Sequence, residues 1–183
     1  DQIVINEIMF HPAAENTGGE YIELHNRSAV AVNLRGWKFS RGVDYEFGSV
    51  EVPPGGYAVL AEAPEALEAR YELSGVLGPY TGRLSNSAEV LLLRDAEERV
   101  VDRVRFADEG SWPEATDGFG PSVGLLHPLL ENRYGPAWAA SDGEGTPGAQ
   151  NSRWTANPLP VVSGVEHAPT VPAPGDAVQV LAN

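Results

Sequence analysis

The chain has 183 residues, of which 42% are hydrophobic and 21% charged, proportions that suit one globular domain with a sizeable core. The net charge is -14 with only 12 Lys and Arg residues, which argues against nucleic acid and anionic membranes as partners, because both are bound through cationic side chains. The lack of cysteine excludes disulfides, thiolate metal sites and a cysteine nucleophile.

No apolar run approaches the roughly 20 residues of a membrane-spanning helix, so we expect no membrane insertion. The sequence opens at Asp1 and Gln2, directly before an apolar run, and we interpret it as a piece from which any targeting segment was removed. Twenty glycines and fifteen prolines spread along the chain separate short apolar runs, a pattern typical of a β-sandwich or barrel.

The first half of the chain consists of short β-type runs between turns. In chain order, the predicted strands cover residues 3–9, 20–26, 29–34 (a short extended run), 36–40, 43–47 and 57–61. The dipeptide Arg41-Gly42 between two alternating runs indicates a tight hairpin.

Residues 64–71 are the only predicted helix, with Pro64 at its start and Glu65 in its first turn, as helix N-termini prefer. The helix is short, so we expect an insert that decorates the sandwich. Residues 89–94 are apolar on both faces and are the predicted central strand, and a turn at residues 95–98 leads into its hairpin partner at residues 100–106.

Regular patterns fade after Phe106. Residues 122–126 are predicted to form a last strand, Trp138 to fill the core from irregular chain, and residues 145–151 to close the unit. We therefore expect one domain over residues 1–153.

The composition of residues 154–183 differs from that of the preceding domain. Five prolines lie between residues 158 and 174, and residues 177–182 resemble a strand without a partner. We interpret this region as a Pro-rich linker and the start of a following domain. The alternative is a C-terminal tail that packs on the first domain.

An ordered set of short motifs over residues 3–151 is similar to the lamin tail domain family. The matching stretches are residues 5–9 with His11-Pro12, 20–24 with Asn26, 32–39, 53–60, 84–86, 90–95, 101–104, 112–113, 120–123, Trp138 and 146–151. The resemblance implies an immunoglobulin-like sandwich with no established catalytic function.

Members of this family occur at the end of nuclear lamins. They also occur as modules of large exported bacterial proteins, beside hydrolases, nucleases or adhesive domains. The resemblance therefore implies an extracellular or cell-surface place in a bacterium. The net charge of -14 argues against carrying over a chromatin or DNA role. The helical insert and the loop over residues 75–82 are longer than a minimal member needs.

Three acidic residues, Glu7, Glu20 and Glu23, lie on the first two predicted strands. Strand alternation places Glu23 with Tyr21 and Glu7 with the isoleucines before it, so at least one carboxylate is expected to face inward. An inward pair can hold a proton or a cation and act in acid/base catalysis. The alternative, which we favour, is that each carboxylate accepts backbone N–H or Arg hydrogen bonds.

Acidic loops suggest calcium as the one possible ion, and no other cofactor is expected. The candidates are Asp108 with Asp117, and Asp142 with Glu144. Calcium needs six to eight converging oxygens, and neither segment matches the EF-hand spacing. The alternative is a pair of solvated acidic loops.

The four histidines are His11, His25, His127 and His167, and none has the spacing of paired metal ligands. His11 and His127 each precede a proline, which is typical of turn residues. The sequence contains neither a Gly-x-Ser-x-Gly elbow nor a phosphate-binding glycine loop before a helix.

Tryptophans supply much of the apolar area. Trp37 is predicted to lie in the core, whereas Trp112 and Trp154 lie in predicted loops, where an exposed ring can stack on a sugar. Packing in the core or linker is the alternative for these two residues.

Three functions follow from these patterns. The first is a non-catalytic interaction or spacer module of a larger exported or surface protein, with a protein, a cell-surface glycan or its neighbouring domains as partners. The second is a calcium- or carbohydrate-binding module that uses the end loops of the sandwich. The third, which we favour least, is a hydrolase that uses Glu7 and Glu23.

Overall fold

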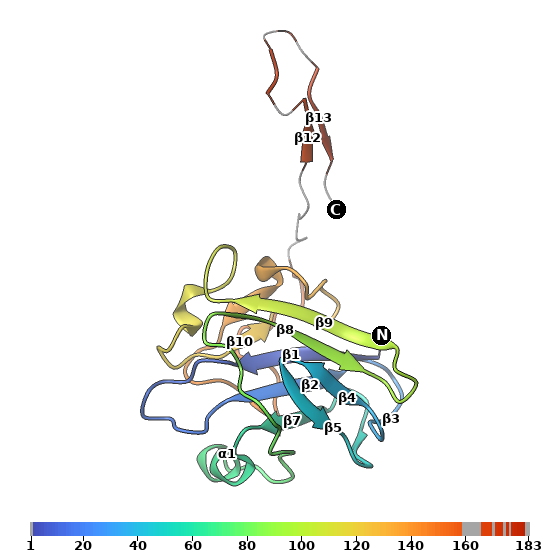
Figure 1. The fold of residues 1–183 in the computed structure, drawn as a ribbon, viewed down its shortest axis with the longest axis vertical. Coiled ribbons are helices and arrows are strands. Elements are labelled where there is room, and N and C mark those ends of the chain that lie inside the picture. The colour runs from blue at the N-terminus through green and yellow to red at the C-terminus, as the bar shows by residue number, and fades with distance from the viewer. Residues whose placement is uncertain (1, 159–165, 170, 174, 176, 182–183) are drawn as a thin grey trace.

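The structure of the chain is a computed structural model that describes residues 2–158, 166–169, 171–173, 175 and 177–181 (Figure 1). Its larger sheet consists of β1 (Ile3–Met9), β2 (Tyr21–Asn26), β7 (Tyr57–Ala61), β10 (Val123–Leu125) and β11 (Trp138–Ala140). Its second sheet consists of β4 (Lys38–Arg41), β5 (Val43–Glu46), β8 (Ala88–Arg94) and β9 (Val100–Ala107). The smaller elements are β3 (Val32–Asn33), β6 (Glu51–Val52), the helix α1 (Pro64–Tyr71), and the 3-10 turns Glu114–Thr116 and Gly135–Ala137.

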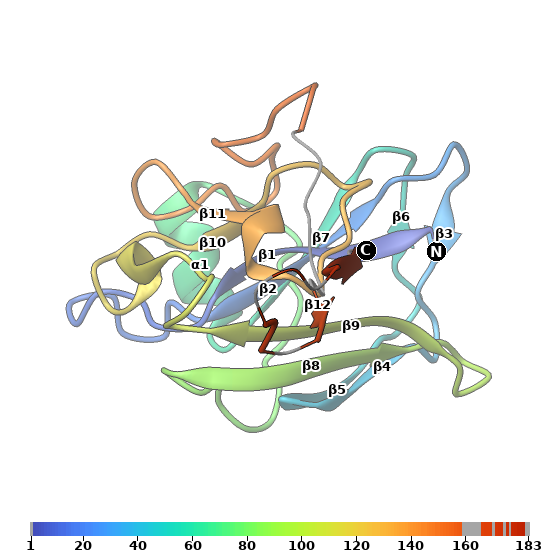
Figure 2. The same ribbon diagram turned by 90° about the horizontal axis from the view of Figure 1, so that it is seen from above.

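The two sheets form the layers of a sandwich, which Figure 2 shows edge-on. The larger sheet has the antiparallel order β11-β10-β1-β2-β7, and the second has the order β5-β4-β8-β9. The predicted all-β, immunoglobulin-like sandwich with one short helical insert is confirmed, and so is the central position of the strand at residues 89–94. The first strand of the chain, β1, lies in the middle of its sheet.

The main core lies between the sheets. Ile5, Ile22 and Leu24 from the larger sheet join Phe39 and Leu91 from the second, and all five side chains are buried. Alternation accounts for this arrangement, because every second residue of a strand faces the same layer. Apolar burial of this kind stabilises the fold by about 25 cal/mol per Å² removed from water.

A second buried cluster covers the opposite face of the larger sheet. Met9, Tyr21, Val59 and Ala61 pack there against Leu67 of α1. Both faces of β1 and β2 are therefore covered, and all seven residues of β1 are buried. A polar side chain on the outer face of these strands is held in the interior of the protein.

The helix α1 occupies the predicted residues. Pro64 lies in its first turn, where a missing N–H costs no hydrogen bond, and Glu65 and Arg70 suit the two ends of the helix dipole. The helix ends at Glu72, which has a left-handed φ of 56° and donates its N–H to the Glu68 carbonyl. Among the described residues, no helix is long and apolar enough to cross a bilayer.

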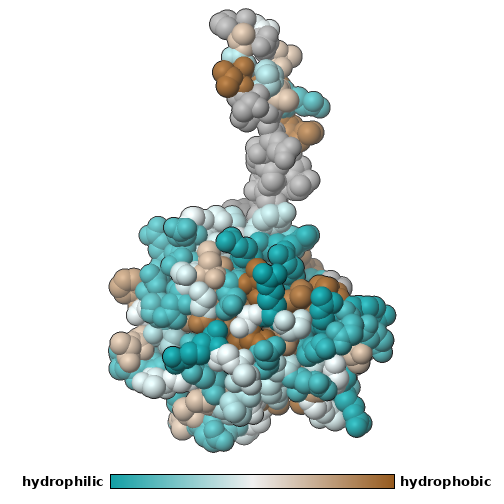
Figure 3. Space-filling view, in the orientation of Figure 1, coloured by the Kyte–Doolittle hydropathy of each residue, from teal (hydrophilic) through white to brown (hydrophobic). Residues whose placement is uncertain are grey.

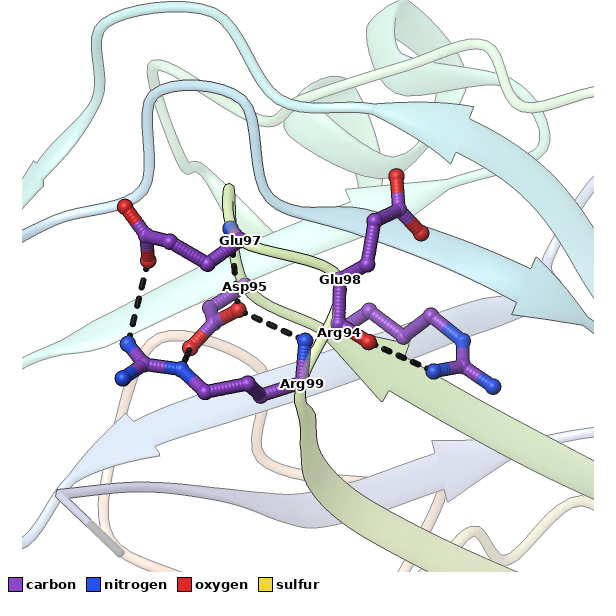
Figure 4. Close-up of polar contacts among 5 residues, drawn as sticks. All are labelled: Arg94, Asp95, Glu97, Glu98 and Arg99. Carbon is purple, nitrogen blue, oxygen red and sulfur yellow. Dashed lines mark hydrogen bonds and ion pairs between the residues drawn. The ribbon is translucent and has the colours of Figure 1, made fainter.

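The turn between β8 and β9 is closed by charged side chains (Figure 4). Asp95 accepts hydrogen bonds from the backbone N–H groups of Glu97 and Arg99, at 3.0 and 2.9 Å, and from Nε of Arg99 at 2.7 Å. Arg94 donates to the Glu98 carbonyl at 2.6 Å. The predicted turn is confirmed, and so is the hairpin at Arg41-Gly42, which joins β4 to β5.

Two predictions about the second half of the chain were wrong. Trp138 lies in β11, which pairs with β10, and not in irregular chain. The C-terminal run at residues 177–182 was expected to lack a partner, but β13 (Gln179–Leu181) pairs antiparallel with β12 (Glu166–Ala168). Within residues 154–183, predicted as a linker and the start of a following domain, residues 159–165, 170, 174, 176, 182 and 183 lie outside the described residues.

Candidate functional site

A buried pair of carboxylates lies on the outer face of the larger sheet. Glu7 of β1 and Glu23 of β2 are paired directly opposite each other, and each is 0% exposed. The β-bulge between Ile5 and Glu7 shifts the register of β1 at this point. The prediction that alternation places Glu7 on the face of Ile3 and Ile5 was wrong, because the bulge turns Glu7 onto the outer face beside Glu23. Both carboxylates are buried there, under the chain that closes the domain.

Residues 145–151, here called the closing segment, supply much of the cover. The Glu7 carboxylate accepts hydrogen bonds from the backbone N–H of Thr146, at 2.9 Å, and from the hydroxyl of Ser122. The Glu23 carboxylate accepts from the backbone N–H of Gly148 at 2.6 Å and from Nδ2 of Asn6 at 2.8 Å. The hydrogen bonds to both glutamates come from backbone, hydroxyl and amide groups, and no Arg takes part in them.

Burial raises the pKa of Glu7 above its usual value, against the hydrogen bonds from Ser122 and Thr146. Burial also raises the pKa of Glu23 well above its usual value, and the neighbouring charge of Glu7 raises it further. Two like charges in a region of low dielectric repel each other strongly, so the pair retains a proton to a higher pH than free carboxyl groups.

Asn151 ties the closing segment to the sheet. Its Nδ2 donates to the carbonyl of Asn6 at 3.0 Å and to the carbonyl of Leu125 at 2.9 Å, and its Oδ1 accepts from Nδ2 of Asn6 at 3.1 Å. Gly145 passes so close to the sheet that a Cβ built there would lie 2.2 Å from the Tyr21 hydroxyl oxygen. The close approach requires a glycine, and it excludes bulky groups from the space above the glutamates.

Glu20 is also buried, but its hydrogen-bond partners are not those of Glu7 and Glu23. Its Oε2 accepts hydrogen bonds from the Tyr80 hydroxyl at 2.9 Å and from the Leu84 N–H at 3.0 Å. Burial raises the pKa of Glu20. This carboxylate anchors the loop before β8 to the start of β2, so its contacts are those of a structural residue.

A cleft of about 270 Å³ opens beside the closing segment. The rings of His25 and Tyr57, on paired positions of β2 and β7, lie 4.7 Å apart in its wall. His127 and Trp154 form a second pair, stacked with ring centroids 5.8 Å apart. The side chain of Gln150 is exposed at the same cleft.

The predicted stacking residues thus have different places. Trp112 is half-buried and packs against Trp138, with ring centroids 5.7 Å apart, so its ring belongs to the edge of the core. Trp154 is 37% exposed and lines the cleft. Trp37 packs against the main core, as expected.

The four calcium candidates do not converge among the described residues. Asp117 contacts Nδ1 of His11 at 2.6 Å, Asp142 contacts Arg153 at 3.3 Å, and Glu144 pairs with Arg70. Asp108 donates its backbone N–H to the Ser87 carbonyl. In the part of the chain that the structure describes, no three His, Cys, Asp or Glu side chains are arranged to hold a metal ion.

The residues that hold the glutamates were not singled out from the sequence as site residues. Ser122 and Thr146 lie more than 110 residues after Glu7, so strand alternation says nothing about their contact with it. The available signal was the closing motif over residues 146–151, which the family resemblance already included.

A sequence model described as Lamin Tail Domain matches residues 1–108. The match covers β1 to β9 and includes all three buried glutamates, whereas the closing segment lies beyond it. No curated protein matches the chain.

Proposed function

The chain belongs to the lamin tail domain family, an immunoglobulin-like fold, and from this premise we propose that it is a non-catalytic interaction module of a larger exported protein. The family is generally without catalytic activity. The finer role, which is to bind a protein or a cell-surface glycan on behalf of neighbouring domains, is our proposal.

One observation carries the non-catalytic part of the proposal. The only carboxylates paired directly across two strands of the described chain, Glu7 and Glu23, have no exposed surface, and their hydrogen bonds are made to the protein itself. A general acid or base must come within hydrogen-bond reach of the proton it transfers. The closing segment lies where a substrate would need to bind, so the pair serves the fold.

The surface suits a module that acts through limited, reversible contacts. The face shown in Figure 3 is mostly hydrophilic, with hydrophobic areas of limited extent. Large exposed apolar patches mark permanent interfaces, whereas weaker contacts use mixed surfaces of this kind. The net charge of -14 keeps the chain soluble and disfavours anionic partners.

The proposed location, outside the cell or on its surface in a bacterium, rests on the exported modules that share this family. Carriage by a larger protein rests on the same resemblance and on the proline-rich composition after residue 157. Loops on a rigid β-sandwich are the usual place for contacts that differ from one family member to another.

Co-sedimentation of the purified chain with bacterial envelope fractions tests the proposal, together with a turnover assay on chromogenic glycosides, esters and phosphodiesters. We expect retention on an envelope fraction without turnover. Turnover that Glu7→Gln abolishes would show an enzyme. Failure to sediment with any fraction would leave only a spacer role and would refute the interaction proposal.

A further inference from the structure

The cleft at Trp154 combines aromatic walls with free hydrogen-bonding groups. His25 and Tyr57 are held by the register of two paired strands, which fixes the first wall on a rigid sheet. The second wall is fixed by backbone hydrogen bonds, because Trp154 donates its N–H to the Asn151 carbonyl and Thr155 donates to the Leu126 carbonyl, both at 3.0 Å. A cleft built in this way is formed before any ligand arrives.

Two polar groups of the cleft are available to a ligand. Gln150 is exposed, and its side chain makes no hydrogen bond to any part of the chain that the structure describes. His127 accepts a hydrogen bond at Nδ1 from the Leu129 N–H at 3.1 Å, so its neutral ring carries the proton on Nε2 and can donate it. An amide and an imidazole N–H match the hydroxyl groups of a polar, uncharged ligand.

The described residues that line the cleft include no Asp, Glu, Lys or Arg, although the chain as a whole carries a charge of -14. Burial lowers the pKa of His25, which keeps that ring uncharged near neutral pH. A charged ligand would therefore find no counter-charge on the described residues that form these walls. The volume of about 270 Å³ lies just below the roughly 300–1,000 Å³ found for small-molecule sites.

We propose that this cleft binds a neutral sugar ring of a glycan, which stacks on Trp154 and is hydrogen-bonded by Gln150 and His127. The apolar face of a pyranose matches an aromatic ring, and its rim of hydroxyl groups matches uncharged donors and acceptors. This inference deepens the proposed function and rests on it, because it names the class of partner and the surface that meets it.

Calorimetric titration of the chain with cellotetraose, maltotetraose and chitotetraose, and separately with choline, tests the assignment. At least one sugar is expected to bind. Trp154→Ala is expected to weaken that binding about tenfold or more, corresponding to about 1.4 kcal/mol. Phe119→Ala is the matched control, since it removes an aromatic side chain that is 79% exposed and does not line the cleft, and it should bind as the wild type does.

A second measurement covers the case in which Trp154→Ala disturbs folding. The bound sugar should reduce acrylamide quenching of the total fluorescence of the four tryptophans in the unaltered chain, because it covers Trp154, and Gln150→Ala, an exposed change, should weaken binding several-fold. Binding of choline in place of the sugars, an undiminished affinity in Trp154→Ala, or no binding by any sugar would overturn the assignment. Envelope retention that persists in Trp154→Ala would keep the interaction module while refuting the cleft as its contact.

Discussion

Glu7→Gln should stabilise the protein near neutral pH, whereas Glu23→Gln should destabilise it. In Glu7→Gln the amide oxygen can keep the position that accepts from Ser122 and the Thr146 N–H, while the amide nitrogen replaces the less bonded Oε2. In Glu23→Gln one donor must face another, because both carboxylate oxygens accept from N–H groups, one from Asn6 and one from Gly148.

The size of the stabilisation expected for Glu7→Gln follows from the register of β1 and β2. Side chains directly opposite each other have Cβ atoms about 5 Å apart, and two full charges at that distance repel by about 3 kcal/mol at an effective dielectric of about 20. The pair can instead keep one proton at about pH 7. Keeping it costs a similar amount, about 3 kcal/mol, because the usual pKa of a Glu carboxyl is 4.5. After about 1 kcal/mol is lost from weaker hydrogen bonds to a neutral amide, Glu7→Gln gains about 2 kcal/mol.

The sign of the pH dependence follows from the raised pKa values of both glutamates. The native state binds more protons than the unfolded chain, so its stability falls as pH rises from about 4.5 through the pKa of the folded state. Thermal melts from about pH 4 to pH 8 should show Glu7→Gln and wild type equal at the acidic end. Near pH 7 the variant should melt about 4–8 °C higher.

The two variants control each other, since each removes one carboxylate of the same pair. An equal loss of melting temperature in Glu7→Gln and Glu23→Gln at neutral pH would show that the charges do not repel in the folded state. A gain in Glu7→Gln that is the same at every pH would also refute the reasoning, because the proposed origin is proton linkage.

Three further changes test the closing segment and the acidic loops. Gly145→Ala should lower stability by about 2–5 kcal/mol in urea denaturation, because φ is 123° and the new Cβ would overlap the Tyr21 hydroxyl; a midpoint like that of wild type would contradict the packing. Asn151→Ala should cost about 2–3 kcal/mol in the same assay, with the exposed neighbour Gln150→Ala as a neutral control; equal effects would show that the amide bridges are not needed. Millimolar calcium or EDTA should leave the melting temperature unchanged, and a calcium-induced rise would revive the acidic loops as a metal site.

The strands and the helix were predictable because their signals are local. Alternation and turn residues identified β4, β5 and the turn at Asp95, and Pro64 with Glu65 marked the start of α1. Shorter or weaker signals failed. The three residues of β11 are too few to show a period, and β12 carries Glu166 and His167, which are unusual in a predicted strand.

The site was predictable only in part, since alternation tells which residues share a face but not what covers that face. Alternation assigned Glu7 to the face of the isoleucines before it, but a bulge turns it onto the face of Tyr21 and Glu23, which α1 and the closing segment cover. The cleft combines His25 with Tyr57, which are 32 positions apart and meet only through strand register. Trp154 was identified as an exposed ring, but its partner His127 was read as a turn residue.

The central position of β1 has a mechanical consequence for the proposed module of a larger protein. Tension that enters at the N-terminal end acts on a strand that pairs with β2 from Ile3 to Met9 and with β10 at Glu7 and Ile8, so the strand lies inside the sheet and not at its edge. At the C-terminal end of the closing segment, the side chain of Asn151 is hydrogen-bonded to Asn6 of β1. A force applied to the two ends of the domain therefore acts on the same set of hydrogen bonds. The domain would therefore resist extension until that set breaks, and it would then unravel as a unit.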